Sequence, residues 1–256
     1  MNRALIFAIS ASLLLGCGAR PTVQPAVSVP APQRLDGTVP ESAEVRAVVD
    51  RYKAQLGERL SVRLAVAAGE FSTEGGPSNT LGVLVADETF AWFAGNTGPE
   101  QPAVQCFITN NGGLRAPLYA GEVKLSHVYE VMPFDNELVV LSLSGAQVQR
   151  VALEIARKGG EPVSGLRFEL RGSGDAAEAS NVFVAGQPLD ATATYQVGTT
   201  DYLAESGWLS GLVKGAPMRR TGALMRDVIA ERLKALDAQG MQLQPKVDDR
   251  IQRKQP

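Results

Sequence analysis

The sequence predicts an α+β fold, and two observations lead to this class. Runs in which apolar and polar residues alternate, typical of strands, occur beside runs with apolar residues three and four apart, typical of helices. The two kinds of run do not follow one another in the regular order of a doubly wound parallel sheet. The patterned part covers residues 45–252, a length that suits one domain with a large core.

From the N-terminal side of this domain, the predicted elements are a helix, a strand, a second helix and a second strand. They occupy residues 45–56, 62–67, 81–85 and 104–109. The first helix is predicted from apolar residues at helical spacing and is expected to end at Gly57. A loop rich in Gly, Ser and Pro, residues 73–79, separates the first strand from the second helix.

The second half of the domain begins with an apolar strand and continues with a helix, a half-buried strand and a final helix. These elements occupy residues 138–143, 148–155, 166–170 and 224–236. Before the final helix we expect a hairpin-like unit made of residues 181–185 and 195–199. Gly240 stops the final helix, and residues 253–256 are expected to form a frayed tail.

Residues 1–17 have the pattern of a bacterial lipoprotein signal peptide. Arg3 precedes an apolar run too short to span a bilayer, and a Leu-Leu-Gly-Cys sequence ends at Cys17. A buried helix that begins at residue 1 is the alternative. With lipid on Cys17, the Pro-rich residues 18–44 would tether the domain to the envelope membrane. Gly18 after the cysteine favours the outer membrane, facing the periplasm.

Charge and cysteine content exclude some function classes. The formal net charge is −2 and basic residues do not cluster, so nucleic-acid binding has no electrostatic support. If Cys17 carries lipid, Cys106 has no partner for an intrachain disulfide. Cys106 lies in an apolar run, where we expect it to act as a small buried hydrophobic residue.

A turn of the form N-x-G-G-x-R is the first candidate binding site. It contains Asn110, Gly112, Gly113 and Arg115. Adjacent glycines permit positive φ and close approach of a ligand to the main chain. The guanidinium group is a rigid, charged fork suited to phosphate or carboxylate. The turn therefore indicates a site for an anion or a polyol, although a turn without a ligand has the same short pattern.

The longer pattern around this turn is more specific. Within residues 110–148, the turn is followed by A-G-E-V, V-Y-E-V-M-P-F-x-N, a strand and L-S-G-A-Q-V. L-G-V-L-V-A-D at residues 81–87, V-S-G-L at 163–166 and Y-Q-V-G-T-T-D-Y-L at 195–203 agree in order. Over about residues 45–252 the chain thus resembles the C-terminal, substrate-binding domain of the 5'-nucleotidase family. The resemblance implies mixed sheets flanked by helices.

Complete members of that family have a further, N-terminal domain that holds two metal ions, which activate water and clamp phosphoryl oxygens. The chain has one histidine, His127, for which we expect a surface or structural role. It contains neither the D-x-H nor the G-N-H-[ED] sequence of that domain. The resemblance therefore implies no catalytic residue, metal or cofactor in this chain, and divalent metals on a partner metallophosphoesterase.

In the family, the C-terminal domain holds the substrate through the Asn and Arg of the turn, a second Arg, two aromatic rings that sandwich the base, and an Asp. By this resemblance, the substrate-binding residues are Asn110, Gly112, Gly113, Arg115 and Tyr202. The face of the Tyr202 ring is suited to stacking on a base.

Other members of that set are missing. Residues 74–78 have no Arg, residues 158–164 have no aromatic ring, and Trp208 stands at the Asp position. Trp208 either offers a substitute ring or fills core space. Arg219 and Arg220 either replace the missing charge or belong to a solvated surface.

Two hypotheses follow. In the first, the chain is the nucleotide- or nucleoside-binding part of a split 5'-nucleotidase and acts with a separate metallophosphoesterase chain. In the second, it is a non-catalytic envelope lipoprotein for binding or scaffolding, with a degenerate nucleotide pocket. A non-nucleotide ligand held by the Arg115 turn is a third possibility.

Overall fold

The computed structural model of the protein describes residues 42–254, apart from the side chains of residues 54 and 55. The expected signal peptide, its Cys17 and residues 18–41 of the expected tether lie outside the described residues. The chain divides into a unit that ends at Arg46 and a second unit that begins at Ala47. The domain described below belongs to the second unit.

Helices and strands are mixed along the chain, as an α+β fold requires. The helices are α1 (Ala43–Leu60), α2 (Thr80–Asn96), α3 (Leu125–Val131), α4 (Gly145–Arg157), α5 (Asp201–Glu205), α6 (Ser210–Val213) and α7 (Met225–Ala238), with short 3-10 turns η1 (Asn111–Gly113) and η2 (Gly174–Ala176). The strands are β1 (Arg63–Ala67), β2 (Cys106–Ile108), β3 (Gly121–Lys124), β4 (Glu137–Ser144), β5 (Val163–Ser164), β6 (Leu166–Arg171), β7 (Glu178–Val184), β8 (Gln187–Pro188), β9 (Thr194–Thr200), β10 (Met218–Leu224) and β11 (Ile251–Arg253).

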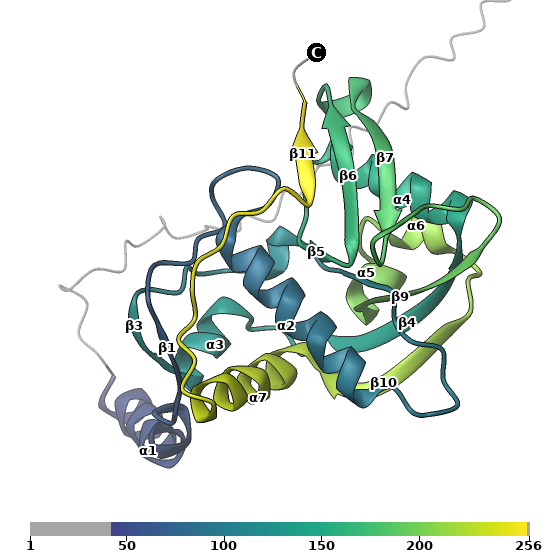
Figure 1. Ribbon diagram of the computed structural model, residues 1–256. Coiled ribbons are helices and arrows are strands. Elements are labelled where there is room, and N and C mark those ends of the chain that lie inside the picture. Colours follow the sequence, from purple (N-terminus) through teal and green to yellow (C-terminus); the bar gives the residue numbers. More distant parts are fainter. Residues whose placement is uncertain (1–41, 255–256) are drawn as a thin grey trace, which may run out of the picture. The chain divides into compact units, whose positions relative to one another are not determined.

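Within residues 42–254 the strands form three sheets, two of which are mixed (Figure 1). The five-stranded sheet has the order β10-β4-β9-β2-β5, with β2 and β9 parallel and the other neighbours antiparallel. The four-stranded sheet has the order β11-β6-β7-β8, with β11 parallel to β6. A two-stranded sheet pairs β1 with β3. The α+β class with mixed sheets flanked by helices is confirmed.

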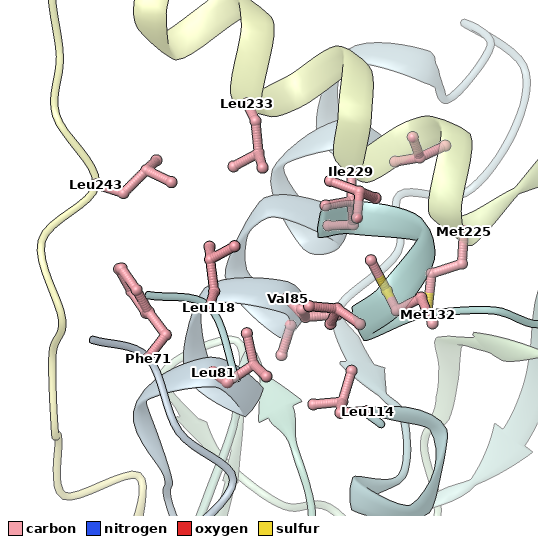
Figure 2. Packing of buried hydrophobic residues seen from close by; sticks show 14 of the residues in the cluster. Phe71, Leu81, Val85, Leu114, Leu118, Met132, Met225, Ile229, Leu233 and Leu243 are labelled. Carbon is pink, nitrogen blue, oxygen red and sulfur yellow. The ribbon is translucent and has the colours of Figure 1, made fainter. Parts of the chain in front are cut away.

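Helices cover the five-stranded sheet on both faces. Because side chains along a strand point alternately to its two faces, a single strand contributes to both cores. On β4, Leu138 and Val140 pack with α2 and α7, whereas Leu141 and Leu143 pack with α4. Figure 2 shows the first of these two cores, whose labelled side chains come from helices and loops that are distant in sequence. They are Phe71, Leu81, Val85, Leu114, Leu118, Met132, Met225, Ile229, Leu233 and Leu243.

Several predicted boundaries of helices and strands were wrong. The first helix continues through Gly57 to Leu60, because one glycine costs a helix only about 1 kcal/mol and does not terminate it. It also begins at Ala43, inside the expected tether. Arg253 belongs to β11 and pairs with β6, so the expected tail begins too early.

The expected hairpin of residues 181–185 and 195–199 was also wrong. β7 pairs with β6 and β8 in the four-stranded sheet, whereas β9 pairs with β4 and β2 in the five-stranded sheet. The two runs are close in sequence, but each finds its partners far along the chain. Local pattern does not specify such partners.

Cys106 has the role that its apolar surroundings predict. Its side chain is completely buried on β2, and burial raises the pKa of the thiol to about 12. The neutral thiol is therefore the stable form at physiological pH, and the prediction of a small buried hydrophobic residue is confirmed.

A charged cluster joins α2, β5 and the C-terminal segment. Arg250 Nη1 donates to Asp87 Oδ1 of α2 at 2.8 Å, and Arg250 Nε donates to Asp248 Oδ1 at 2.7 Å. The same Nη1 donates to the carbonyl oxygen of Val163 at 2.5 Å. Ser164 Oγ donates to Asp87 Oδ1 at 2.7 Å. One guanidinium group therefore holds together three segments that are distant in sequence.

Both kinds of group in this cluster stay ionised. Burial alone would lower the pKa of the Arg250 guanidinium, but the hydrogen bonds and charges of Asp248 and Asp87 raise it. Burial alone would raise the pKa of Asp248, but the hydrogen bonds and charge of Arg250 lower it. Because the side chain of Arg250 is only 13% exposed, these bonds are poorly screened by solvent.

We expect Arg250→Met to lower the free energy of unfolding by about 2–3 kcal/mol, since it removes the partner of two carboxylates that are themselves partly exposed. Urea unfolding measures the change. Arg253→Met is the matched control, because Arg253 is exposed and makes one long hydrogen bond, to Gly172 O at 3.4 Å. Equal losses in the two variants would contradict the role given to Arg250.

Candidate functional site

A pocket of about 230 Å³ lies where three loops meet at one edge of the five-stranded sheet. It is lined by Asn110, Gly112, Gly113, Phe134, Asn136 and Tyr202. The sheet explains why these loops meet. β2 and β9 are parallel neighbours, so the segments that follow them leave the sheet at the same edge, and the antiparallel β4 enters there. The pocket is therefore formed by the turn after β2, the start of α5 after β9, and the loop before β4.

The turn after β2 is built closely around the side chain of Asn110. Asn110 has an extended backbone and is followed directly by η1. A Cβ atom added to Gly113 would lie 3.2 Å from Asn110 Oδ1, and one added to Gly112 would lie 3.2 Å from Asn110 Nδ2. Neither glycine has positive φ, so the turn does not use the conformation that adjacent glycines permit. These glycines instead leave space for the Asn110 amide.

Asn111 holds the turn in place through three hydrogen bonds. Its backbone N–H donates to Glu161 Oε2 at 2.7 Å, and its Nδ2 donates to Gly160 O at 3.2 Å. Its Oδ1 accepts from Asn79 Nδ2 at 2.7 Å. Asn79 is also the N-cap of α2, where its Oδ1 accepts from the backbone N–H of Gly82 at 2.7 Å. The turn is thus hydrogen-bonded to the start of α2 and to the segment before β5.

Two aromatic rings line the pocket and remain open to solvent. The exposed fractions of Tyr202 and Phe134 are 49% and 47%. Asp201 links their loops, because its Oδ1 accepts from the backbone N–H of Glu137 at 3.0 Å and from that of Tyr202 at 2.7 Å. Half-exposed rings beside amide groups can stack on a planar ligand and hydrogen-bond its edge.

Sequence reasoning missed two of the lining residues, Phe134 and Asn136. The expected position of a first ring, residues 158–164, has no aromatic side chain, and Phe134 is a ring from another loop. The M-P-F-x-N segment was interpreted only as a turn. The signal that could have found the pair was an aromatic residue and an amide two positions apart, directly before an apolar strand.

The structure brings together four of the five predicted binding residues: Asn110, Gly112, Gly113 and Tyr202. Arg115 is not among the lining residues. It is exposed, its Nη1 donates to Gly112 O at 3.1 Å, and its backbone N–H donates to Val131 O at 2.8 Å. In this geometry the Arg115 guanidinium group stabilises its own turn and does not line the pocket.

Neither proposed replacement for the missing charge lines the pocket. Arg220 Nη1 lies 2.6 Å from Glu137 Oε2, and Arg220 also pairs with Asp201 and Glu205. The backbone N–H of Gly222 and the Arg220 guanidinium lower the pKa of Glu137, which keeps this pair ionised. Arg219 lines a separate pocket beside α2.

Trp208 and His127 have structural roles. Trp208 is half-buried against the core that contains α4, which agrees with the packing role and not with a substitute ring. His127 Nδ1 accepts from the backbone N–H of Lys124 at 3.2 Å and so caps α3, as the structural expectation for His127 required.

Over residues 42–254 the structure brings no three His, Cys, Asp or Glu side chains together as a metal site would require. Within the same residues, no helix combines the length and apolar character needed to cross a membrane.

Loops at one end of the five-stranded sheet thus present two aromatic rings and two side-chain amides around one pocket. The sequence model of the family "5'-nucleotidase, C-terminal domain" matches residues 62–210, more than half of the chain. The chain belongs to this family.

Similar proteins include the trifunctional nucleotide phosphoesterase YfkN of Bacillus subtilis, which is 25% identical over 85% of this chain and 16% of its own length. The NAD 5'-nucleotidase of Haemophilus influenzae is 30% identical over 63% of this chain and 30% of its own length. The chain therefore spans less than a third of either relative. The crystal structure of a 5'-nucleotidase precursor from Thermus thermophilus shares the fold, with a TM-score of 0.67 and 24% identity over 84% of this chain and 44% of that one.

We expect Asn79→Ala to lower the free energy of unfolding by about 1–2 kcal/mol, because it removes the N-cap of α2 together with the bond to Asn111. Urea unfolding measures the loss. Ser78→Ala is the neighbouring control, since the buried Ser78 hydroxyl has no hydrogen-bond partner in the described structure. A loss for Ser78→Ala as large as that for Asn79→Ala would contradict the assignment.

Proposed function

We propose that the chain is the nucleoside- or nucleotide-binding part of a split 5'-nucleotidase, anchored to the bacterial envelope through lipid on Cys17. The observation that carries this proposal is the pocket whose lining includes the rings of Phe134 and Tyr202 and the amides of Asn110 and Asn136. A purine or pyrimidine base is flat and has donors and acceptors around its rim. Two rings and two amides provide the matching stacking and hydrogen-bonding surfaces.

The pocket favours recognition of the base and sugar over recognition of the phosphate. Its lining contains amides, backbone and rings, whereas the nearby Arg220 is already paired with carboxylates. Phosphate binding and hydrolysis would then belong to a separate metallophosphoesterase chain, whose divalent metals would activate water. Arg115, exposed beside the turn, is positioned to meet such a partner or the ligand's charged end.

A second function is favoured by one observation. Arg115 donates to Gly112 O instead of lining the pocket, so the charged member of the family's binding set is engaged within the protein. This favours a non-catalytic envelope lipoprotein that binds a ligand or acts as a scaffold. Co-purification of a metallophosphoesterase with the full-length protein distinguishes the two functions.

We expect the full-length protein to bind adenosine, and Tyr202→Ala or Phe134→Ala to weaken binding about tenfold to a hundredfold, since one stacked ring contributes about 1–3 kcal/mol. Isothermal titration calorimetry measures the dissociation constants. Tyr119→Ala is the control, because Tyr119 is 67% exposed and lies outside the pocket lining. If neither ring variant alters adenosine binding, this pocket is not the base site.

For the assembled pair, we expect Arg115→Ala to reduce the rate of AMP hydrolysis at least tenfold, because a charge-assisted contact to the ligand is worth about 1.5–3 kcal/mol. Phosphate release with the co-purified partner measures the rate. Arg171→Ala is the control, since Arg171 is exposed on β6, in the other sheet. An unchanged rate for the Arg115 variant would contradict the split-enzyme proposal and leave the binding lipoprotein.

A further inference from the structure

The short segment between α4 and β5 contacts the turn after β2, which lines the pocket. Glu161 makes this contact, because its Oε2 accepts from the backbone N–H of Asn111 at 2.7 Å. At the other end of the segment, Lys158 Nζ lies 5.9 Å from the centre of the Trp208 ring, which follows α5 and does not line the pocket.

The two contacts are linked within the segment itself. Lys158 Nζ lies 3.7 Å from Glu161 Oε1, so the carboxylate joins an ammonium group on one side and the Asn111 amide on the other. The backbone between them is tightly held. Gly160 has φ of 124°, and a Cβ atom there would lie 2.3 Å from the Cα of Pro77. Gly160 therefore packs directly against Pro77 and leaves no room for a side chain.

We propose that Glu161 is a positioning residue for the pocket, whose carboxylate holds the Asn110–Gly113 turn in its ligand-binding position through Asn111. This inference rests on the proposed function, in which the pocket binds a nucleoside. Glu161 does not line the pocket and acts only through the turn.

The charge of Glu161 matters because the carboxylate is nearly enclosed. Glu161 is 6% exposed, and burial raises its pKa, while the Asn111 N–H and Lys158 partly offset that effect. Among the described residues, Lys158 is the charged group in contact with it; the turn and the start of α2 present the uncharged amides of Asn111 and Asn79.

The direction of the pH dependence follows from the contacts. The ionised carboxylate is the stronger acceptor for the Asn111 N–H and the only form that pairs with Lys158. As pH falls through the pKa of Glu161 and the carboxyl group stays enclosed, the bond to the Asn111 N–H and the ion pair with Lys158 both weaken, so the turn is held less firmly. Affinity for the ligand should therefore decrease at acid pH.

Three variants of the full-length protein test this role, with adenosine as the probe. Glu161→Leu removes the acceptor and should weaken adenosine binding about tenfold at neutral pH. Glu161→Gln keeps an oxygen acceptor but carries no charge and cannot titrate, so it should bind about threefold more weakly than the wild type at neutral pH, equally at acid pH, and lose the pH dependence. Glu154→Gln, which changes a carboxylate of α4 that pairs with Arg157, should retain the wild-type affinity and pH profile.

A second measurement does not depend on adenosine. In ¹⁵N-labelled protein without ligand, the Asn111 amide proton should resonate downfield, titrate with pH, and move upfield in Glu161→Leu. If adenosine does not bind the wild type but the Asn111 amide behaves in this way, the proposed function fails and the contact stands. If adenosine binds and Glu161→Leu changes neither its affinity nor the Asn111 resonance, the positioning role is overturned.

Discussion

The pocket depends on the parallel pairing of β2 with β9. The strand order brings the carboxyl ends of these two strands to the edge where β4 begins, so three loops distant in sequence open at one place. Gly198 is one of the β9 residues paired on both sides, since it lies opposite Phe107 on β2 and Val140 on β4. A Cβ atom there would lie 2.8 Å from the Phe93 ring, so the absence of a side chain lets α2 press onto the sheet at this point.

Two arginines near the pocket, Arg220 and Arg226, are paired with carboxylates and do not line it. Arg220 is occupied by Glu137 and its neighbours, and the nearly buried Arg226 pairs with Asp135, next to Phe134. What lines the pocket is therefore uncharged. Such a lining selects its ligand by shape, stacking and hydrogen bonds, and salt should change its affinity little. A phosphate group would find its stabilisation outside this lining, which is why the proposed function assigns that task to a second protein.

Features of the fold that depend on local contacts could be predicted from the sequence, and features that depend on contacts between distant segments could not. The element types followed from hydrophobic spacing, as the strand around Leu138 and the helix around Val151 show, because burial on one face leaves a period in the sequence. The grouping of Asn110, Gly112, Gly113 and Tyr202 followed from resemblance. Strand partners did not follow, since β7 and β9 each pair with segments far along the chain.

The site itself was only partly predictable for a related reason. Phe134 was missed because its segment was interpreted only as a turn, and its place in the pocket depends on the position of that loop beside β9. Arg115 was expected to line the pocket, yet its side chain is directed to a carbonyl group of its own turn. Glu161 gave no signal at all, because a single acidic residue in a loop looks solvated until its burial is known.

The cluster around Arg250 shows that the folded domain extends beyond the residues matched by the family model. The match to the family model stops at residue 210, but Arg250 supplies the guanidinium group that joins α2 to β5, and β11 completes the four-stranded sheet. The stretch recognised by sequence similarity is therefore smaller than the physical domain. A fragment cut at residue 210 would lack an edge strand from each of the two mixed sheets and would expose the apolar surface that α7 covers.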